Sequence, residues 1–128
     1  MSQLVALLLI LSGNQHFNTR LGPEREAAIL AEVAAEYQLD EEQTRLLFCV
    51  RRIENGDPVK GIEMGVGENG DHPARRYAGD AEASLRLQAM WASGTIAKHY
   101  RGDLTAWSRR WCPVNALAWE RMAREISK

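Results

Sequence analysis

The chain has 128 residues, which suits one domain with a single hydrophobic core and is short for two domains. Apolar residues make up 45% and charged residues 26% of the sequence, so a disordered or fibrous chain is excluded. The net charge of -1 is unevenly distributed, because acidic residues dominate from Glu24 to Arg45 and basic residues dominate from Arg75 onward. We expect one domain over residues 1–128, whose basic half faces either solvent or a polyanionic partner.

The first segment is apolar from Leu4 to Leu11. It is too short to span a bilayer, which needs about 20 apolar residues, so no stable membrane span is expected. It also lacks the Lys or Arg that precedes the apolar part of a signal peptide, although Ser12 and Gly13 suit cleavage. The apolar pattern of residues 1–12 therefore predicts a packed first helix or strand, with an atypical export signal as the alternative.

Two helices are predicted in the next part of the chain. Pro23 suits the first turn of a helix, where its missing N–H is not needed. Asp40 followed by Gln43 forms a capping-box pattern that begins a second helix, and Asn55-Gly56 supplies its stop signal. Apolar residues recur along this second helix at helical spacing, at Leu46, Leu47, Val50 and Ile53.

Glu54 is the last residue before the stop signal of the second helix. Each residue advances about 100° around a helix, so Glu54 lies within about 40° of Leu47 and Val50 and shares their buried face. A carboxyl group in such a place is partly desolvated, which disfavours its charged form. That is the profile of a general acid that works near neutral pH. The alternative is an ordinary carboxylate that reaches solvent or pairs with Arg51.

A long connection follows, over residues 55–79, which is rich in glycine and has no sustained periodicity. Connections of this length are uncommon in a small domain and are often functional. A weak alternation in residues 61–66 predicts a short β-hairpin arm. Because this loop comes directly after Glu54, we expect it to form the wall of a cleft.

Three more helices are predicted beyond the loop. Asp80 is expected to cap a helix that runs to about Tyr100, with Gly94 in its interior allowing close packing against another helix. Asp103 is expected to cap a short helix, and Asn115 a terminal one. The buried face of the long helix is predicted to consist of Leu85, Ala89, Ala92, Ile96 and Tyr100. The predicted fold class is therefore mainly α.

The cysteines and histidines are scattered along the chain. Neither Cys49 nor Cys112 belongs to a CxxC motif or to a Cys/His cluster, so neither a metal site nor a cofactor is expected. A disulfide between the two cysteines and a pair of free thiols both remain open.

Several segments occur in an order that carries a family resemblance. They are residues 51–56 (RRIENG), 61–66 (GIEMGV), 74–80 (ARRYAGD), 84–89 (SLRLQA) with 94–96 (GTI), and 100–111 (YRGDLTAWSRRW). Together they give a helix that ends in a single Glu, then a glycine-rich loop, then helices that carry Tyr and Trp. This order resembles the lysozyme-like superfamily. The closer likeness is to small muramidases and lytic-transglycosylase-like proteins of phages and prophages. The resemblance implies a lysozyme-like helical domain.

The resemblance also implies a reaction, the cleavage of the β-1,4 bond between N-acetylmuramic acid and N-acetylglucosamine in peptidoglycan. Glu54 matches the catalytic acid that protonates the leaving glycosidic oxygen. Glycoside hydrolysis usually needs a second carboxylate, for which Glu63 is preferred over Asp57 and Asp71 because it lies in the segment expected to wall the cleft. Without a second carboxylate, the acetamido group or the C6 hydroxyl of the sugar is the nucleophile. Hydrolase and transglycosylase both remain open.

Sugar binding needs flat apolar surfaces with polar edges, which Tyr and Trp provide. Trp111 and Trp119 are assigned to the core, and Gln88 either reaches into the cleft or faces solvent. The predicted substrate-binding residues are Met64 on the loop together with Tyr77, Tyr100 and Trp107, with burial in the core as the alternative for the aromatic ones.

The expected partner is the glycan strand of peptidoglycan, bound by a monomer at the cell wall, in the periplasm or in a phage particle. One alternative is a catalytically inactive lysozyme-like module that binds glycan or builds part of a phage particle or secretion apparatus. A second alternative is a nucleic-acid binder that uses the basic half of the chain. No recognition-helix pattern or basic-aromatic motif favours it, so no nucleic-acid partner is expected.

Overall fold

The computed structural model describes residues 3–13, 16–66 and 72–127, and in these ranges it contains helices and no strand. The helices are α1 (Gln3–Ser12), α2 (Pro23–Glu36), α3 (Glu41–Glu54), α4 (Pro73–Arg76), α5 (Ala81–His99), α6 (Leu104–Trp111) and α7 (Ala116–Ile126). The predicted mainly α class is confirmed. The β-hairpin arm predicted for residues 61–66 is wrong, because these residues form turns.

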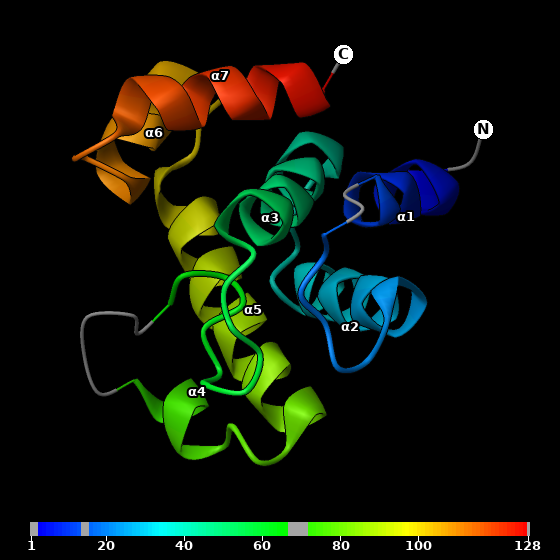
Figure 1. Cartoon of the computed structure of the whole chain (residues 1–128). Coiled ribbons are helices and arrows are strands. Elements are labelled where there is room, and N and C mark those ends of the chain that lie inside the picture. Colours follow the sequence, from blue (N-terminus) through cyan, green and yellow to red (C-terminus); the bar gives the residue numbers. More distant parts are fainter. Residues whose placement is uncertain (1–2, 14–15, 67–71, 128) are drawn as a thin grey trace.

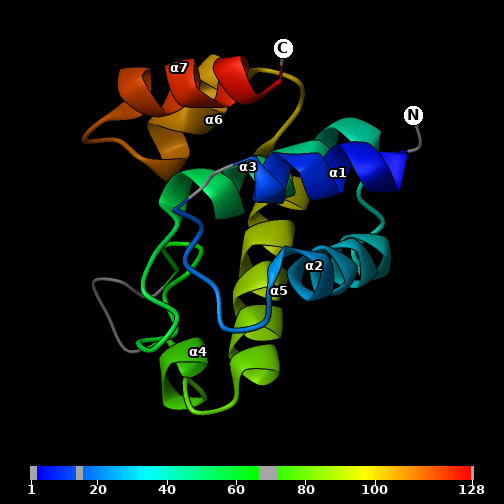
Figure 2. The same ribbon diagram turned by 45° about the vertical axis from the view of Figure 1, so that its right-hand side comes forward.

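The long helix α5 runs through the middle of the molecule (Figures 1 and 2). Helices α2 and α3 pack against it, and α1 covers α2 and α3 from the outside. Helix α4 packs beside the first part of α5, whereas α6 and α7 form a pair near its far end, where α7 also contacts α3. The end of α3 therefore lies where helices from both halves of the chain meet.

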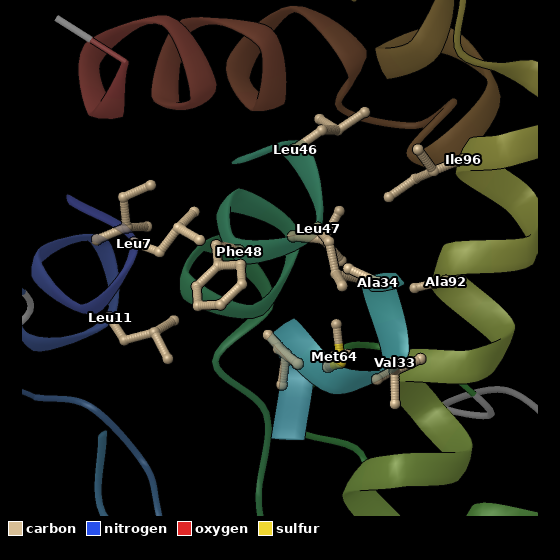
Figure 3. Close-up of a cluster of buried hydrophobic side chains, with 14 of the residues drawn as sticks. Leu7, Leu11, Val33, Ala34, Leu46, Leu47, Phe48, Met64, Ala92 and Ile96 are labelled. Atoms are coloured by element: carbon tan, nitrogen blue, oxygen red, sulfur yellow. The ribbon is translucent and has the colours of Figure 1, made fainter. Parts of the chain in front are cut away.

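The hydrophobic core lies between α1, α2, α3 and α5 (Figure 3). Fully buried side chains from each of these helices meet there, because each helix has an apolar face that must leave water. The core includes Leu11 of α1, Val33 of α2, Leu47 and Phe48 of α3, Ala92 and Ile96 of α5, and Met64 from the loop.

The helix ends follow the predicted capping signals in most cases. Asp40 and Gln43 form the complete capping box of α3, and Pro23 is the first residue of α2. The carboxylates of Asp80 and Asp103 accept hydrogen bonds from the first turns of α5 and α6. Asn115 precedes α7 as predicted, but its side chain makes no capping hydrogen bond.

The apolar first segment forms α1, which confirms the prediction of a packed first element. Leu7, Ile10 and Leu11 are buried against α2 and α3, whereas Leu4 and Leu9 remain exposed. Within the described ranges, no helix combines the length and the apolar character needed to cross a bilayer.

Residues 61–66 of the connection after α3 fold toward the core. The N–H of Gly56 donates to the carbonyl of Glu63 at 3.0 Å, which closes a compact turn directly after α3. A side chain at Gly56 would collide with the carbonyl of Ile62, so only glycine fits this close approach. As a result, Glu63, Met64 and Val66 are buried.

Candidate active site

A groove with a volume of about 1210 Å³ runs along α5. The face of α5 formed by Leu85, Ala89, Ala92 and Ile96 packs into the core as predicted, so the neighbouring positions of the helix point elsewhere. These positions line the groove: Leu87, Met90, Trp91, Gly94, Thr95, Lys98 and His99. Its other described lining residues are Tyr37, Glu54, Gly65, Val66, His72, Pro73 and residues 110–114.

Glu54 lies on the wall of this groove, at the last position of α3. Its side chain is half-buried, and its Oε2 accepts a hydrogen bond of 2.8 Å from the indole N–H of Trp119 on α7. On the other side the backbone of Gly65 (φ +75°) is so close that an added Cβ would collide with Glu54 Oε1. The carboxyl group is therefore held between α7 and the loop.

The residue after Glu54 fixes the direction in which the chain leaves α3. Asn55 adopts a left-handed conformation (φ +40°), which Asn tolerates better than most residues. Its Oδ1 accepts from the backbone N–H of Asn18 at 2.8 Å, and its Nδ2 donates to the carbonyl of His16 at 3.0 Å. The side chain of Asn18 donates in return to the Asn55 carbonyl at 2.9 Å. The end of α3 is thus tied to the segment that precedes α2.

A buried ion pair lies one turn before Glu54. Arg51 and Glu26 are both almost completely buried, and the guanidinium donates to both carboxylate oxygens, at 2.6 and 3.1 Å. Arg51 also donates to the carbonyl of Asn18 and stacks on the ring of Phe17, with 4.2 Å from Cζ to the ring centroid. Its charge is thus neutralised by Glu26 of α2, and the last turn of α3 is anchored to α2.

Glu63 does not lie where the sequence predicted. Its side chain is only 3% exposed and is not part of the groove, because the turn after α3 folds into the core. Gln88 of α5, also fully buried, donates to Glu63 Oε1 at 3.0 Å and accepts from the backbone N–H of Met64 at 2.8 Å. Burial raises the pKa of Glu63, and the hydrogen bond from Gln88 opposes this rise. The expectation that Glu63 walls the cleft is therefore wrong.

The other two carboxylates considered for the second group are placed differently. Asp57 accepts a hydrogen bond from the backbone N–H of Val59 at 2.9 Å, a side-chain-to-backbone turn that Asp commonly forms. Asp71 lies outside the described residues.

None of the four predicted substrate-binding residues lines the groove that contains Glu54. Met64 and Trp107 are buried in the core. Tyr100 continues the buried face of α5, and its hydroxyl donates to Glu42 at 2.6 Å beside a second cavity of about 870 Å³. Tyr77 follows α4 and is 55% exposed, away from the groove. Their expected place in the cleft is wrong. For Tyr100 and Trp107 the alternative of burial holds, because the apolar faces of α5 and α6 turn toward the core.

Other aromatic residues occupy the groove instead. Trp91 is 57% exposed, and its ring meets that of His72 edge to face, with centroids 5.4 Å apart. Trp111, which was assigned to the core, is half-buried and stacks on Trp107 with centroids 5.3 Å apart. Tyr37 at the end of α2 completes the set. A Trp that falls off the apolar face of a long helix, as Trp91 does, is the signal that would have identified this surface.

Gly94 has a different setting from the one expected. A Cβ added there would lie 3.5 Å from Tyr37 Cε2, which is an ordinary contact, so close packing between helices does not require glycine here. Helices α2 and α5 do pack together, but this packing does not depend on a missing side chain at Gly94. Gly94 is instead part of the groove lining, where the absence of a side chain keeps the surface low.

Within the described ranges, no group of three or more His, Cys, Asp or Glu residues is arranged to hold a metal ion. Cys49 and Cys112 are both free thiols, which resolves the choice that the sequence left open.

Comparisons of the chain with protein-family models, with curated proteins and with solved structures found no match.

Proposed function

We propose that the protein is a glycosidase with a lysozyme-like domain, which cleaves the β-1,4 bond between N-acetylmuramic acid and N-acetylglucosamine in peptidoglycan. The observation that carries the proposal is the carboxyl group of Glu54, half-buried on the wall of a long groove and held by a hydrogen bond from Trp119. A general acid needs such a fixed orientation toward the oxygen that it protonates.

The size and lining of the groove support a polymeric sugar as the substrate. A volume of about 1210 Å³ exceeds the roughly 300–1,000 Å³ of common small-molecule pockets and leaves room for several sugar rings. Tyr37, Trp91 and Trp111 offer the apolar ring faces on which sugars stack. The groove lining also contains polar side chains, including His72, Thr95 and Lys98, which can form hydrogen bonds with sugar hydroxyl groups.

In the proposed mechanism Glu54 begins in its protonated form and gives its proton to the leaving glycosidic oxygen. The carboxylate that results gains negative charge, and the N–H of Trp119 stabilises it at Oε2. The close approach of Gly65 limits rotation of the carboxyl group and so helps to fix its orientation.

The reaction products distinguish the possible nucleophiles. Glu54 is the single Asp or Glu among the described residues that line the groove, so the proposal assigns it the proton transfer alone. Attack by the C6 hydroxyl of the substrate gives anhydro-muramic ends, whereas attack by water or through the acetamido group gives reducing ends. Mass spectrometry of digested peptidoglycan distinguishes these products.

The deciding experiment compares Glu54→Gln with Glu63→Gln on purified peptidoglycan. We expect the wild-type protein and the Glu63→Gln variant to release soluble fragments, because Glu63 is buried outside the groove. The Glu54→Gln variant should still sediment with peptidoglycan but release at least about 100-fold less product, since general acid catalysis contributes 10²–10⁴-fold. Full activity of Glu54→Gln would refute the proposed role. Binding without cleavage by the wild type would favour the inactive glycan-binding or structural module.

A further inference from the structure

Three basic residues gather in one part of the groove. Lys98 and His99 belong to the last turn of α5, and Arg110 belongs to the last turn of α6. Within the described part of the chain, Lys98 and Arg110 form no ion pair with an acidic side chain. These charges therefore remain available to a ligand.

The three basic residues also act on one another. The pKa of His99 is lowered, first by desolvation and then by the positive charges of Arg110, Lys98 and Arg101. Like charges that are close together repel, and a bound anion relieves that repulsion. Part of this arrangement also suits the negative ends of the α5 and α6 helix dipoles, which favour basic residues in a last turn. A helix-dipole role requires no ligand, so binding measurements separate the two explanations.

We infer that Lys98, His99 and Arg110 form a subsite for a carboxylate group carried by the glycan, so that the groove prefers acidic sugar chains over neutral ones. The inference rests on the proposed function, because it takes the groove to be the glycan site. It adds the chemical class of sugar that the groove selects. Arg binds a carboxylate through two parallel hydrogen bonds and Lys adds a flexible point charge, so Arg110 and Lys98 are the main contacts.

The test measures binding without turnover, in the Glu54→Gln background. Isothermal titration calorimetry compares a soluble peptidoglycan glycan fragment that retains its carboxyl groups with the same fragment after chemical reduction of these groups to hydroxyls. We expect the acidic fragment to bind at least about tenfold more tightly, because a hydrogen bond to a charged group contributes on the order of this factor. Its affinity should also fall as the salt concentration rises.

Two double variants in the same background test the residues. Lys98→Ala with Arg110→Ala should lower the affinity for the acidic fragment to about that for the reduced fragment, and so abolish the preference. The matched control, Lys60→Ala with Arg121→Ala, removes two exposed basic residues that line neither cavity and should keep the preference. Circular dichroism and thermal unfolding confirm that both variants fold.

The inference is overturned if the two fragments bind the starting protein equally well, if neither fragment binds, or if the Lys98 and Arg110 substitutions weaken both fragments alike. Its failure differs from failure of the proposed function. If the wild type cleaves peptidoglycan but shows no charge preference, the subsite alone is refuted. If the protein prefers the acidic fragment but the wild type cleaves nothing, the enzymatic function is refuted and the subsite is supported.

Discussion

The carboxyl group of Glu54 is held by residues that are far from it in the sequence. Its place at the end of a capped helix was predictable, because the capping box at Asp40 and the stop at Asn55 are local signals. Its hydrogen bond from Trp119 was not predictable, since the two residues meet only after α7 has docked on α3. The sequence predicts Trp119 in the core, and this is confirmed. It does not predict the partner of the indole N–H, which is Glu54.

Replacing Trp119 with Phe tests this hydrogen bond. Loss of a hydrogen bond to a charged group costs roughly 1.5–3 kcal/mol, so we expect kcat to fall about 10- to 100-fold with little change in KM. The control is Trp107→Phe, because Trp107 is equally buried but its indole N–H has no hydrogen-bond partner among the described residues. Steady-state kinetics of both variants on peptidoglycan check the prediction, and an equal loss in both would contradict it.

The buried carboxyl group of Glu63 predicts a pH-dependent stability. Because burial raises its pKa above the ordinary value of 4.5, the folded protein favours the protonated form. The stability that this group contributes is complete below the unfolded pKa and is lost as the pH rises through the higher, folded pKa. We expect Glu63→Gln to flatten the decline in the free energy of unfolding above about pH 4.5. Urea titrations across this pH range measure it, and parallel curves for both proteins would disprove it.

At the scale of the elements, α5 has two faces with different tasks. The apolar spacing from Leu85 to Ile96 was enough to predict its buried face. The opposite face also carries apolar residues at helical spacing, namely Leu87, Met90 and Trp91, so periodicity alone could not show which face lines a groove. The burial of Glu63 on the loop before α5 was not predicted, for a related reason. Glycine can indicate exposed turns, but Gly56 and Gly65 serve here to bring the backbone close to its neighbours.

Substitutions at Gly94 separate the groove from the stability of α5. Gly94→Ala should raise the free energy of unfolding by roughly 0.5–1 kcal/mol, because alanine favours a helix, and should keep activity. Gly94→Leu should also leave the helix intact but place a large side chain in the groove, with an expected increase in KM of at least about tenfold. Thermal unfolding and kinetics on peptidoglycan give both values. Unchanged KM in Gly94→Leu would show that substrate does not pass over this position.

The ion pair between α2 and α3 can be tested by removing one or both partners. Arg51→Met should destabilise the protein by about 3–5 kcal/mol, since it leaves the buried carboxylate of Glu26 without its partner. The double variant Arg51→Met with Glu26→Leu should regain much of this loss, because no uncompensated charge remains. Chemical unfolding of the wild type, Arg51→Met and the double variant measures both changes. A double variant as unstable as the single one would contradict this account.

At the scale of the whole molecule, the helical class and most helix starts followed from the sequence, whereas the arrangement of the helices did not. Capping and periodicity act within a few residues, so they define α2, α3 and α5. The contact of α7 with α3, and the groove between α5 and the turn after α6, depend on packing between distant segments. The aromatic residues of the groove were missed for this reason. Of those predicted for it, Tyr100 and Trp107 are buried and Tyr77 is exposed outside the groove.

The docking of α7 on α3 has a consequence for biosynthesis. Glu54 leaves the ribosome well before Trp119 has been translated, so a nascent chain holds the carboxyl group without its indole partner. The complete site therefore forms only after Trp119 has been joined and α7 has docked on α3. Under the proposed function, a chain that stops before Trp119 would be a poor catalyst.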